Sequence, residues 1–235
     1  MARKVIRGRP SDFPGEGDFD PTATALLVID LQVAFLSEDG YLASKGYDTA
    51  PLRAILPNVN AVIERARAAG CLIIHTRQGH RADLADMMRM SQRRQLRAAL
   101  AKTPMLVRSS PGFQIVPDIT VHEDDIIIDK TANGAFTHTD LEHVLHVQGI
   151  THLMFAGCTT DVCVHSTLRE ANDRGFECVL IEDCCASGDA YAHAAAVHMV
   201  TVEGGIFGVV SNAENVMAGL NRRWRRPSVL GRKRR

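Results

Sequence analysis

Six short apolar runs, most of them followed by a segment with helical spacing, constrain the fold of this chain more than any other feature. The runs are residues 24–30, 71–75, 126–128, 152–156, 178–182 and 206–210. A strand of a parallel sheet is buried on both faces and needs a nearly continuous apolar sequence. Helices are expected at 52–69, near 92–101, and at 139–148, 161–174, 189–202 and 213–220. The alternation predicts an α/β fold, a doubly wound and mainly parallel six-stranded sheet with helices on both faces.

The length of 235 residues, with 46% hydrophobic and 23% charged residues, is typical of one folded domain. We place that domain at residues 22–221. Residues 1–21 carry glycines and prolines among charges and are expected to form an irregular arm. Residues 222–235 form a basic tail, with eight arginines and lysines around Trp224. A short terminal block of like charge usually stays solvated, so the tail is not expected to bind nucleic acid.

The charge and the cysteine content indicate which binding partners and which cellular compartment to expect. The formal net charge is zero, which gives no general attraction for nucleic acid. No stretch approaches the roughly 20 apolar residues of a membrane span, and no apolar segment follows the start of the chain. Most of the six cysteines lie in or beside apolar runs and lack zinc-ligand spacing. Reduced cysteines in a reducing cytoplasm are therefore expected, with no membrane partner and no structural metal.

Cys163 is the first candidate for chemistry. It follows the apolar run at 152–156 and the small-residue turn 157–160, and it lies in the first turn of the helix expected at 161–174. The dipole and free N–H groups of a helix start favour a thiolate and lower the pKa of such a sulfur. A lone cysteine is more often a small buried hydrophobe, so Cys163 needs supporting residues.

Asp30 and Lys130 supply that support, because each ends another apolar run. Alone, Asp30 could begin a turn and Lys130 could be a solvated lysine. The carboxyl ends of parallel strands meet at one edge of the sheet, where α/β proteins place their sites. There Asp30 could take the proton of Cys163. The positive charge of Lys130 would favour the Asp30 carboxylate and the Cys163 thiolate. The backbone N–H groups of Thr159 and Cys163 could stabilise an oxyanion.

These motifs resemble the isochorismatase-like cysteine hydrolases and, within that family, the biuret hydrolases. The resemblance covers roughly residues 24–220, through the segments 28–35, 73–84, 127–130, 159–164 and 204–208. It implies that Asp30, Lys130 and Cys163 are a catalytic triad, that the Cys158–Thr159 peptide bond is cis, and that the protein is a homotetramer. Some relatives bind a metal through an aspartate and two histidines. His75 and His80 are available here, but biuret-type relatives carry similar residues without a catalytic metal, so no metal and no cofactor are expected.

Glu203 departs from the biuret hydrolases, whose usual residue at this position is glutamine. An ionised carboxylate only accepts hydrogen bonds, and a guanidinium pairs with it through two N–H groups. We therefore expect Glu203 to bind the cationic end of guanylurea while Cys163 attacks its urea carbonyl. Phe35 is expected to form an aromatic wall of the pocket. Glu203 at the surface and Phe35 in the core are the structural alternatives.

The sequence leaves three other functions open. Hydrolysis of a neutral ureide, such as biuret, or of ureidoacrylate is the nearest alternative to guanylurea hydrolysis. A redox sensor would use Cys163 with Cys158 as its resolving cysteine, although the position of Cys158 at a strand end fits a turn better. A nucleic-acid module would use the basic tail. The first choice is a cysteine-dependent amidohydrolase that cleaves a terminal amide C–N bond of a small ureide.

Overall fold

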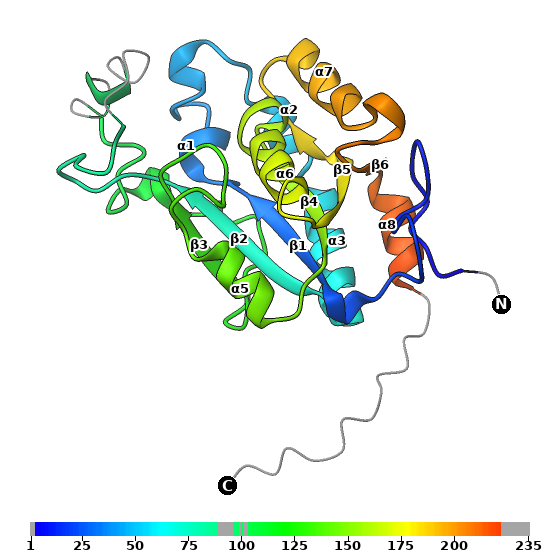
Figure 1. Ribbon diagram of the computed structural model, residues 1–235. Helices are drawn as coiled ribbons and strands as arrows, with labels where there is room; N and C mark the ends of the chain where they lie inside the picture. The colour runs from blue at the N-terminus through cyan, green and yellow to red at the C-terminus, as the bar shows by residue number, and fades with distance from the viewer. Residues whose placement is uncertain (1–2, 89–95, 99, 101–102, 222–235) are drawn as a thin grey trace, which may run out of the picture.

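Strand β1 (Thr24–Ile29) lies in the middle of a six-stranded sheet with the order β3-β2-β1-β4-β5-β6. The other strands are β2 (Leu72–Gln78), β3 (Ile126–Lys130), β4 (His152–Cys158), β5 (Glu177–Ala186) and β6 (Val209–Ser211). All neighbouring strands pair in parallel (Figure 1). This computed structural model describes residues 3–88, 96–98, 100 and 103–221. The predicted α/β fold with a parallel six-stranded sheet is confirmed.

The strands differ from their predicted ranges mainly at their ends. β2 continues three residues past its apolar run, to Gln78, and β3 continues two residues past its run, to Lys130. β6 begins only at Val209, three residues later than expected. Gly208 explains this delay, because its φ of 137° favours glycine and a Cβ there would overlap the Cys178 carbonyl.

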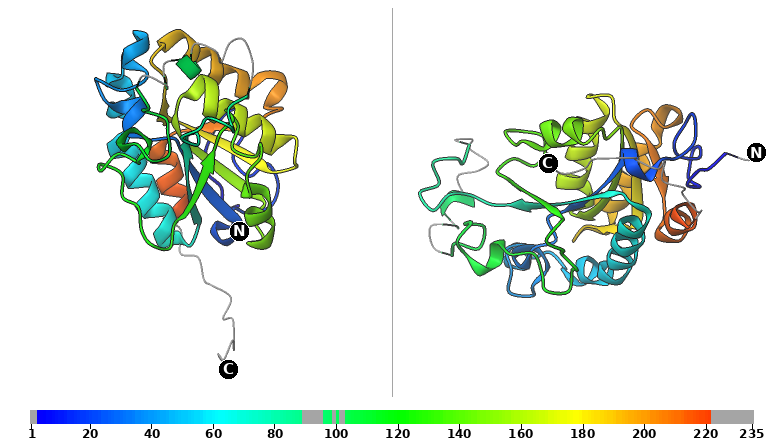
Figure 2. Two further views of the ribbon diagram at one scale, coloured as in Figure 1. Left: turned by 90° about the vertical axis from the view of Figure 1, so that its left-hand side faces the viewer. Right: turned by 90° about the horizontal axis from the view of Figure 1, so that it is seen from below.

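Two layers of helices cover the sheet. The helices are α1 (Val33–Leu36), α2 (Ala50–Ala54), α3 (Leu56–Ala69), α5 (Leu141–Val147), α6 (His165–Asn172), α7 (Ala190–Val200) and α8 (Ala213–Leu220). Shorter turns are the 3-10 helices η1 (Pro21–Ala23), η2 (Ala43–Lys45), η3 (Pro111–Phe113) and η5 (Val202–Gly204), and the π-helical turn η4 (Thr160–Val164). Figure 2 shows α3 and α8 on one face and α5, α6 and α7 on the other.

Apolar residues at helical spacing built these helices as expected. On α3, Val59, Val62 and Ile63 are fully buried in one core layer. On α6, Leu168 and Ala171 are buried in the other. The segment predicted as one helix at 161–174 divides into η4 and α6, so Cys163 lies in a π-helical turn. The helix predicted near 92–101 falls largely outside the described residues, and α1 was not predicted.

The N-terminal arm packs on the domain. Ile6, Phe13 and Phe19 are nearly fully buried in the same core layer as α8. Arg9 exchanges two backbone hydrogen bonds of 2.9 Å with Val210 on the edge strand β6. The arm therefore covers one edge of the sheet. The basic tail 222–235 lies outside the described residues.

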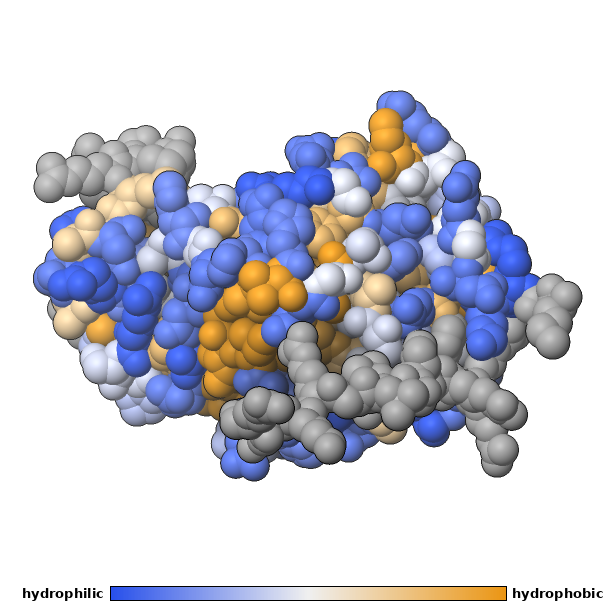
Figure 3. All heavy atoms as spheres, turned by 60° about the horizontal axis from the view of Figure 1, so that its bottom comes forward, coloured by the Kyte–Doolittle hydropathy of each residue, from blue (hydrophilic) through white to orange (hydrophobic). Residues whose placement is uncertain are grey.

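An apolar area lies on the face of the molecule that Figure 3 shows. Hydrophobic side chains gather on the side of the molecule that holds β3 and α5 (Figure 3), where Ile127 and Val147 are exposed. Among the described residues, no helix is long and apolar enough to cross a membrane.

Candidate active site

Asp30 occupies the point where β1 leaves the sheet. Its φ of 51° is left-handed, so the chain turns sharply after Ile29. The residue is fully buried, and its Oδ1 accepts a 2.6 Å hydrogen bond from Thr76 Oγ1 on β2. Its Oδ2 lies 2.8 Å from Lys130 Nζ. One oxygen of the carboxylate therefore binds a neutral donor, and the other binds a cationic donor.

Lys130 ends β3 and is surrounded by oxygen atoms. Its Nζ donates to Gln78 Oε1 at 2.9 Å and to the carbonyls of Ala132 and Asn133 at 3.0 Å each, in addition to its contact with Asp30. Burial by itself lowers the pKa of Lys130, but the negative charges of Asp30 and Cys163 outweigh it and raise the pKa above the ordinary value. Lys130 is therefore a fixed cation of the site.

Cys163 lies in η4, just after the end of β4, and its sulfur interacts electrostatically with both Asp30 and Lys130. Burial raises the pKa of Cys163 to about 12, and Lys130 only partly offsets this rise. The lowered pKa that its place at a helix start predicted is therefore wrong, because burial outweighs the nearby cation. With this raised pKa, formation of a thiolate needs a proton acceptor, and Asp30 is the carboxylate that interacts with Cys163.

The turn before Cys163 has the geometry that the resemblance implied. The Cys158–Thr159 peptide bond is cis. The Cys158 sulfur is fully buried and donates to the Asp30 carbonyl at 3.1 Å. That bond joins the ends of β1 and β4. Thr159 and Cys163 both line the cavity described next. That their N–H groups stabilise an oxyanion stays a prediction.

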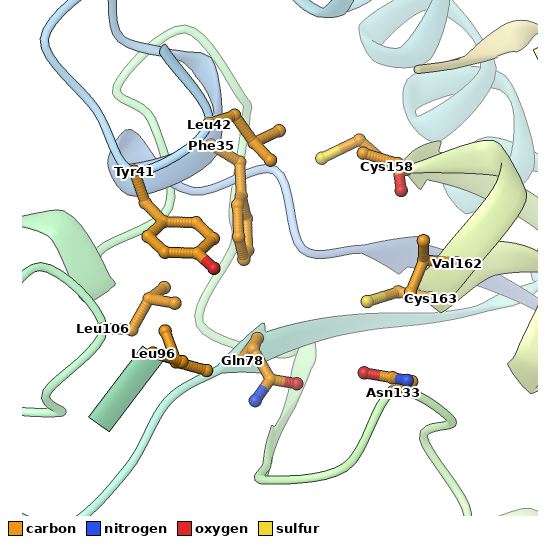
Figure 4. Close-up of a pocket in the computed structure, with 11 residues that line it drawn as sticks. Phe35, Tyr41, Leu42, Gln78, Leu96, Leu106, Asn133, Cys158, Val162 and Cys163 are labelled. Carbon is orange, nitrogen blue, oxygen red and sulfur yellow. The ribbon is translucent and has the colours of Figure 1, made fainter. Parts of the chain in front are cut away.

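A cavity of about 220 Å³ opens over Cys163. Its described lining consists of Phe35, Tyr41, Leu42, Gln78, Leu96, Leu106, Asn133, Cys158, Thr159, Val162 and Cys163. Figure 4 shows the Cys163 sulfur and the Asn133 amide on one side, facing Phe35 and the Tyr41 ring on the other. Phe35 and Tyr41 contact each other edge to face, with ring centroids 6.4 Å apart. Phe35 therefore lies in the wall where it was expected.

Sequence reasoning missed the polar residues that surround the three reactive groups. Thr76 and Gln78 lie at the end of β2 and contact Asp30 and Lys130, respectively. Asn133 and Tyr41 come from loops. Thr76 and Gln78 lie past the apolar run that predicted β2, and nothing in the local pattern marks the two loop residues.

Glu203 is not among the residues that line the cavity, and its side chain is exposed. It has a φ of 51° in the turn η5, between the end of α7 and the start of β6. β6 begins beside Val179, in the first half of β5, whereas the cavity lies at the carboxyl ends of the strands. The expected contact between Glu203 and a substrate is therefore not present in the single chain.

His75 and His80 are buried, and neither is among the described residues that line the cavity. His75 lies in the middle of β2, with its Nε2 3.2 Å from Asp125 Oδ2, and burial lowers its pKa. His80 Nδ1 lies 3.5 Å from Asp86 Oδ1. Within the described residues, no group of three or more histidine, cysteine, aspartate or glutamate side chains is arranged to hold a metal ion.

The chain resembles known amide hydrolases in sequence and fold. A model described as the isochorismatase domain matches residues 24–215. The chain is 32% identical over 225 residues to the ureidoacrylate amidohydrolase RutB of Klebsiella pneumoniae subsp. pneumoniae, covering 88% of this chain and 91% of the relative. RutB of Klebsiella variicola is 33% identical over 220 residues, covering 86% and 89%.

Two solved structures illustrate the shared fold. A cysteine hydrolase from Pseudomonas syringae pv. phaseolicola superposes with a TM-score of 0.77 at 23% identity, covering 94% of this chain and 98% of that one. N-carbamoylsarcosine amidase from Thermoplasma acidophilum superposes with a TM-score of 0.63 at 20% identity, covering 81% and 96%.

Proposed function

Because this chain belongs to the isochorismatase family and is an amide-bond hydrolase, we propose that it cleaves the terminal amide C–N bond of a small planar ureide. The observation that carries the proposal is that Cys163 lines a small cavity and interacts electrostatically with the buried ion pair of Asp30 and Lys130. A thiol, a proton acceptor and a fixed cation are the parts that an acyl transfer needs.

In the first half of the reaction, the Cys163 thiol gives its proton to Asp30 and the sulfur attacks the terminal carbonyl carbon. The N–H groups of Thr159 and Cys163 stabilise the oxyanion. The C–N bond then breaks, and Asp30 returns the proton to the leaving nitrogen, which departs as ammonia. The product of this half is an acyl-enzyme with a thioester-like bond to Cys163.

In the second half, water attacks the acyl carbon and gives a proton to Asp30. The C–S bond breaks, the proton passes to the sulfur, and a carboxylated nitrogen product leaves. Lys130 remains protonated throughout and compensates the negative charge, which is first on Asp30, then on the sulfur. From biuret the product is allophanate. From guanylurea it is a carboxyguanidine, which loses carbon dioxide to leave guanidine.

The cavity wall favours a flat substrate without net charge. Phe35 and Tyr41 offer aromatic surface, and the Gln78 and Asn133 amides can offer both donors and acceptors to a urea group. The described lining contains no acidic or basic side chain. Biuret satisfies these conditions. Ureidoacrylate adds a carboxylate, and guanylurea adds a cation that Glu203, exposed in the single chain, would have to reach.

Ammonia release from biuret, guanylurea, ureidoacrylate and acetamide, measured with the wild type and Cys163→Ala, tests the proposal. We expect biuret to be the best of the four substrates and Cys163→Ala to be inactive on all of them. Preferred hydrolysis of guanylurea would indicate that Glu203 contacts the substrate. Preferred hydrolysis of acetamide would refute a ureide substrate. Undiminished ammonia release by Cys163→Ala would refute the nucleophile.

A further inference from the structure

The point where β1 leaves the sheet creates a gap beside β2. Ile29 is the last residue of β1 that pairs with β2, opposite Thr76. β2 continues to Gln78, which still pairs with Lys130 on its other side. The Gly79 N–H donates to the Lys130 carbonyl, so the backbone groups of Gln78 itself face the side that β1 has left.

The side chain of Gln32 fills this gap. Its Oε1 accepts from the Gln78 N–H at 2.6 Å, and its Nε2 donates to the Gln78 carbonyl at 3.0 Å. The same Nε2 donates to the Phe113 carbonyl at 2.9 Å. Gln32 is fully buried. A side-chain amide thus replaces the peptide group that a continuing strand would have offered, and it fixes the backbone of Gln78 beside the site.

The side chain of Gln78 continues this connection to the reactive groups. Its Oε1 accepts from Lys130 Nζ at 2.9 Å, while its Nε2 donates to the Thr131 carbonyl at 3.1 Å. The second bond determines which end of the amide faces the ammonium. We propose that Gln32 and Gln78 are positioning residues that hold the Lys130 ammonium where it contacts Asp30 and Cys163. The proposal rests on the proposed function only in requiring that Lys130 assists Cys163.

Gln78 also lines the cavity, so a variant at this position can act through substrate binding as well. Gln32 is not among the described lining residues, and within the described part of the chain its side chain bonds only to backbone groups of Gln78 and Phe113. Variants of Gln32 therefore separate positioning of Lys130 from direct contact with substrate. A positioning role lowers kcat and leaves KM nearly unchanged, whereas loss of a substrate contact raises KM.

The test measures alkylation of Cys163 by iodoacetamide, with the modified peptide identified by mass spectrometry, in Gln32→Glu, Gln32→Met and Gln78→Met. Alkylation needs no substrate, so it reports on the sulfur even if no ureide is hydrolysed. Gln114→Glu is the matched control, because Gln114 is exposed and lies in the neighbouring segment. Folding is checked for each variant by circular dichroism.

We expect the Gln32 variants and Gln78→Met to lower the alkylation rate of Cys163 by about tenfold. On the best ureide, kcat of the Gln32 variants should fall roughly 10- to 100-fold with KM within about threefold, as small misplacements of catalytic groups do. Gln114→Glu should match the wild type. A folded Gln32→Glu or Gln32→Met with wild-type alkylation and kcat would overturn the proposal. If neither Gln32 variant folds, wild-type alkylation in a folded Gln78→Met would overturn it as well.

Discussion

The buried ion pair between Asp30 and Lys130 should make an asymmetric contribution to stability. In Lys130→Met, the fully buried Asp30 carboxylate keeps the neutral donor Thr76 Oγ1 but loses its cation. Leaving a buried charge without its partner costs about 3–5 kcal/mol. In Asp30→Asn, the ammonium keeps three oxygen acceptors, on Gln78, Ala132 and Asn133. Asp30→Asn should therefore lower the free energy of unfolding by about the value of one charged hydrogen bond, about 1.5–3 kcal/mol.

The double variant Asp30→Asn/Lys130→Met should be no less stable than Lys130→Met alone, because asparagine needs no cation beside it. The coupling energy between the two positions is then about 2 kcal/mol. Urea unfolding followed by circular dichroism, at one protein concentration, measures it. With a slope of about 2.5 kcal/mol/M, Lys130→Met should lower the midpoint by about 1–2 M.

A neighbouring ion pair, between β2 and β3, is the control. Arg77 Nε lies 2.8 Å from Asp129 Oδ1, with side chains 21% and 33% exposed, so this pair is worth only about 0–1 kcal/mol. The cycle of Arg77→Met and Asp129→Asn should show little coupling. Additive effects at Asp30 and Lys130, or equal coupling in the two cycles, would refute the claim that burial makes the catalytic pair interdependent.

Three further predictions concern activity, specificity and pH. Cys163→Ser and Asp30→Asn should each lower kcat by roughly 10³-fold or more, and the double variant should be little worse, because members of one catalytic unit act together; multiplying effects in steady-state kinetics would contradict a shared step. Glu203→Gln should leave the ratio of kcat/KM for guanylurea to that for biuret within about twofold, since Glu203 does not line the cavity; a shift of about tenfold toward biuret would show that its carboxylate reaches the substrate. Burial lowers the pKa of His75 below its ordinary value of 6.5, so the unfolded chain binds a proton at a higher pH than the folded protein does. The free energy of unfolding should therefore fall as the pH drops from about 6.5 toward the pKa of the folded state. The urea midpoint of His75→Gln should change less between pH of about 7.5 and 5.5 than that of the wild type, and an equal change would assign the pH dependence to other groups.

The reactive residues were predictable because each follows an apolar run. Asp30 directly follows β1, Lys130 ends β3 and Cys163 lies in the turn that leaves β4. Parallel strands end at one edge of a sheet, so these residues converge. Their convergence needed no side-chain detail. The residues that hold them were not predictable in this way. Gln78 contacts Lys130 from a strand that extends past its apolar run, and Gln32 works by replacing a peptide group in a gap that the sequence does not display.

Local sequence by itself determined the strands and helices, because hydrophobic periodicity reports which faces of a segment are buried. It also determined that a thiol, a carboxylate and an amine would meet. Tertiary packing decided the properties that depend on several segments at once. The pKa of Cys163 rises because surrounding chain removes water, which outweighs its place at a helix start. Glu203 lies at the surface because α7 and β6 place it there. Desolvation of a side chain, and its distance from remote segments, depend on many parts of the folded chain at once. No single stretch of sequence therefore determines them.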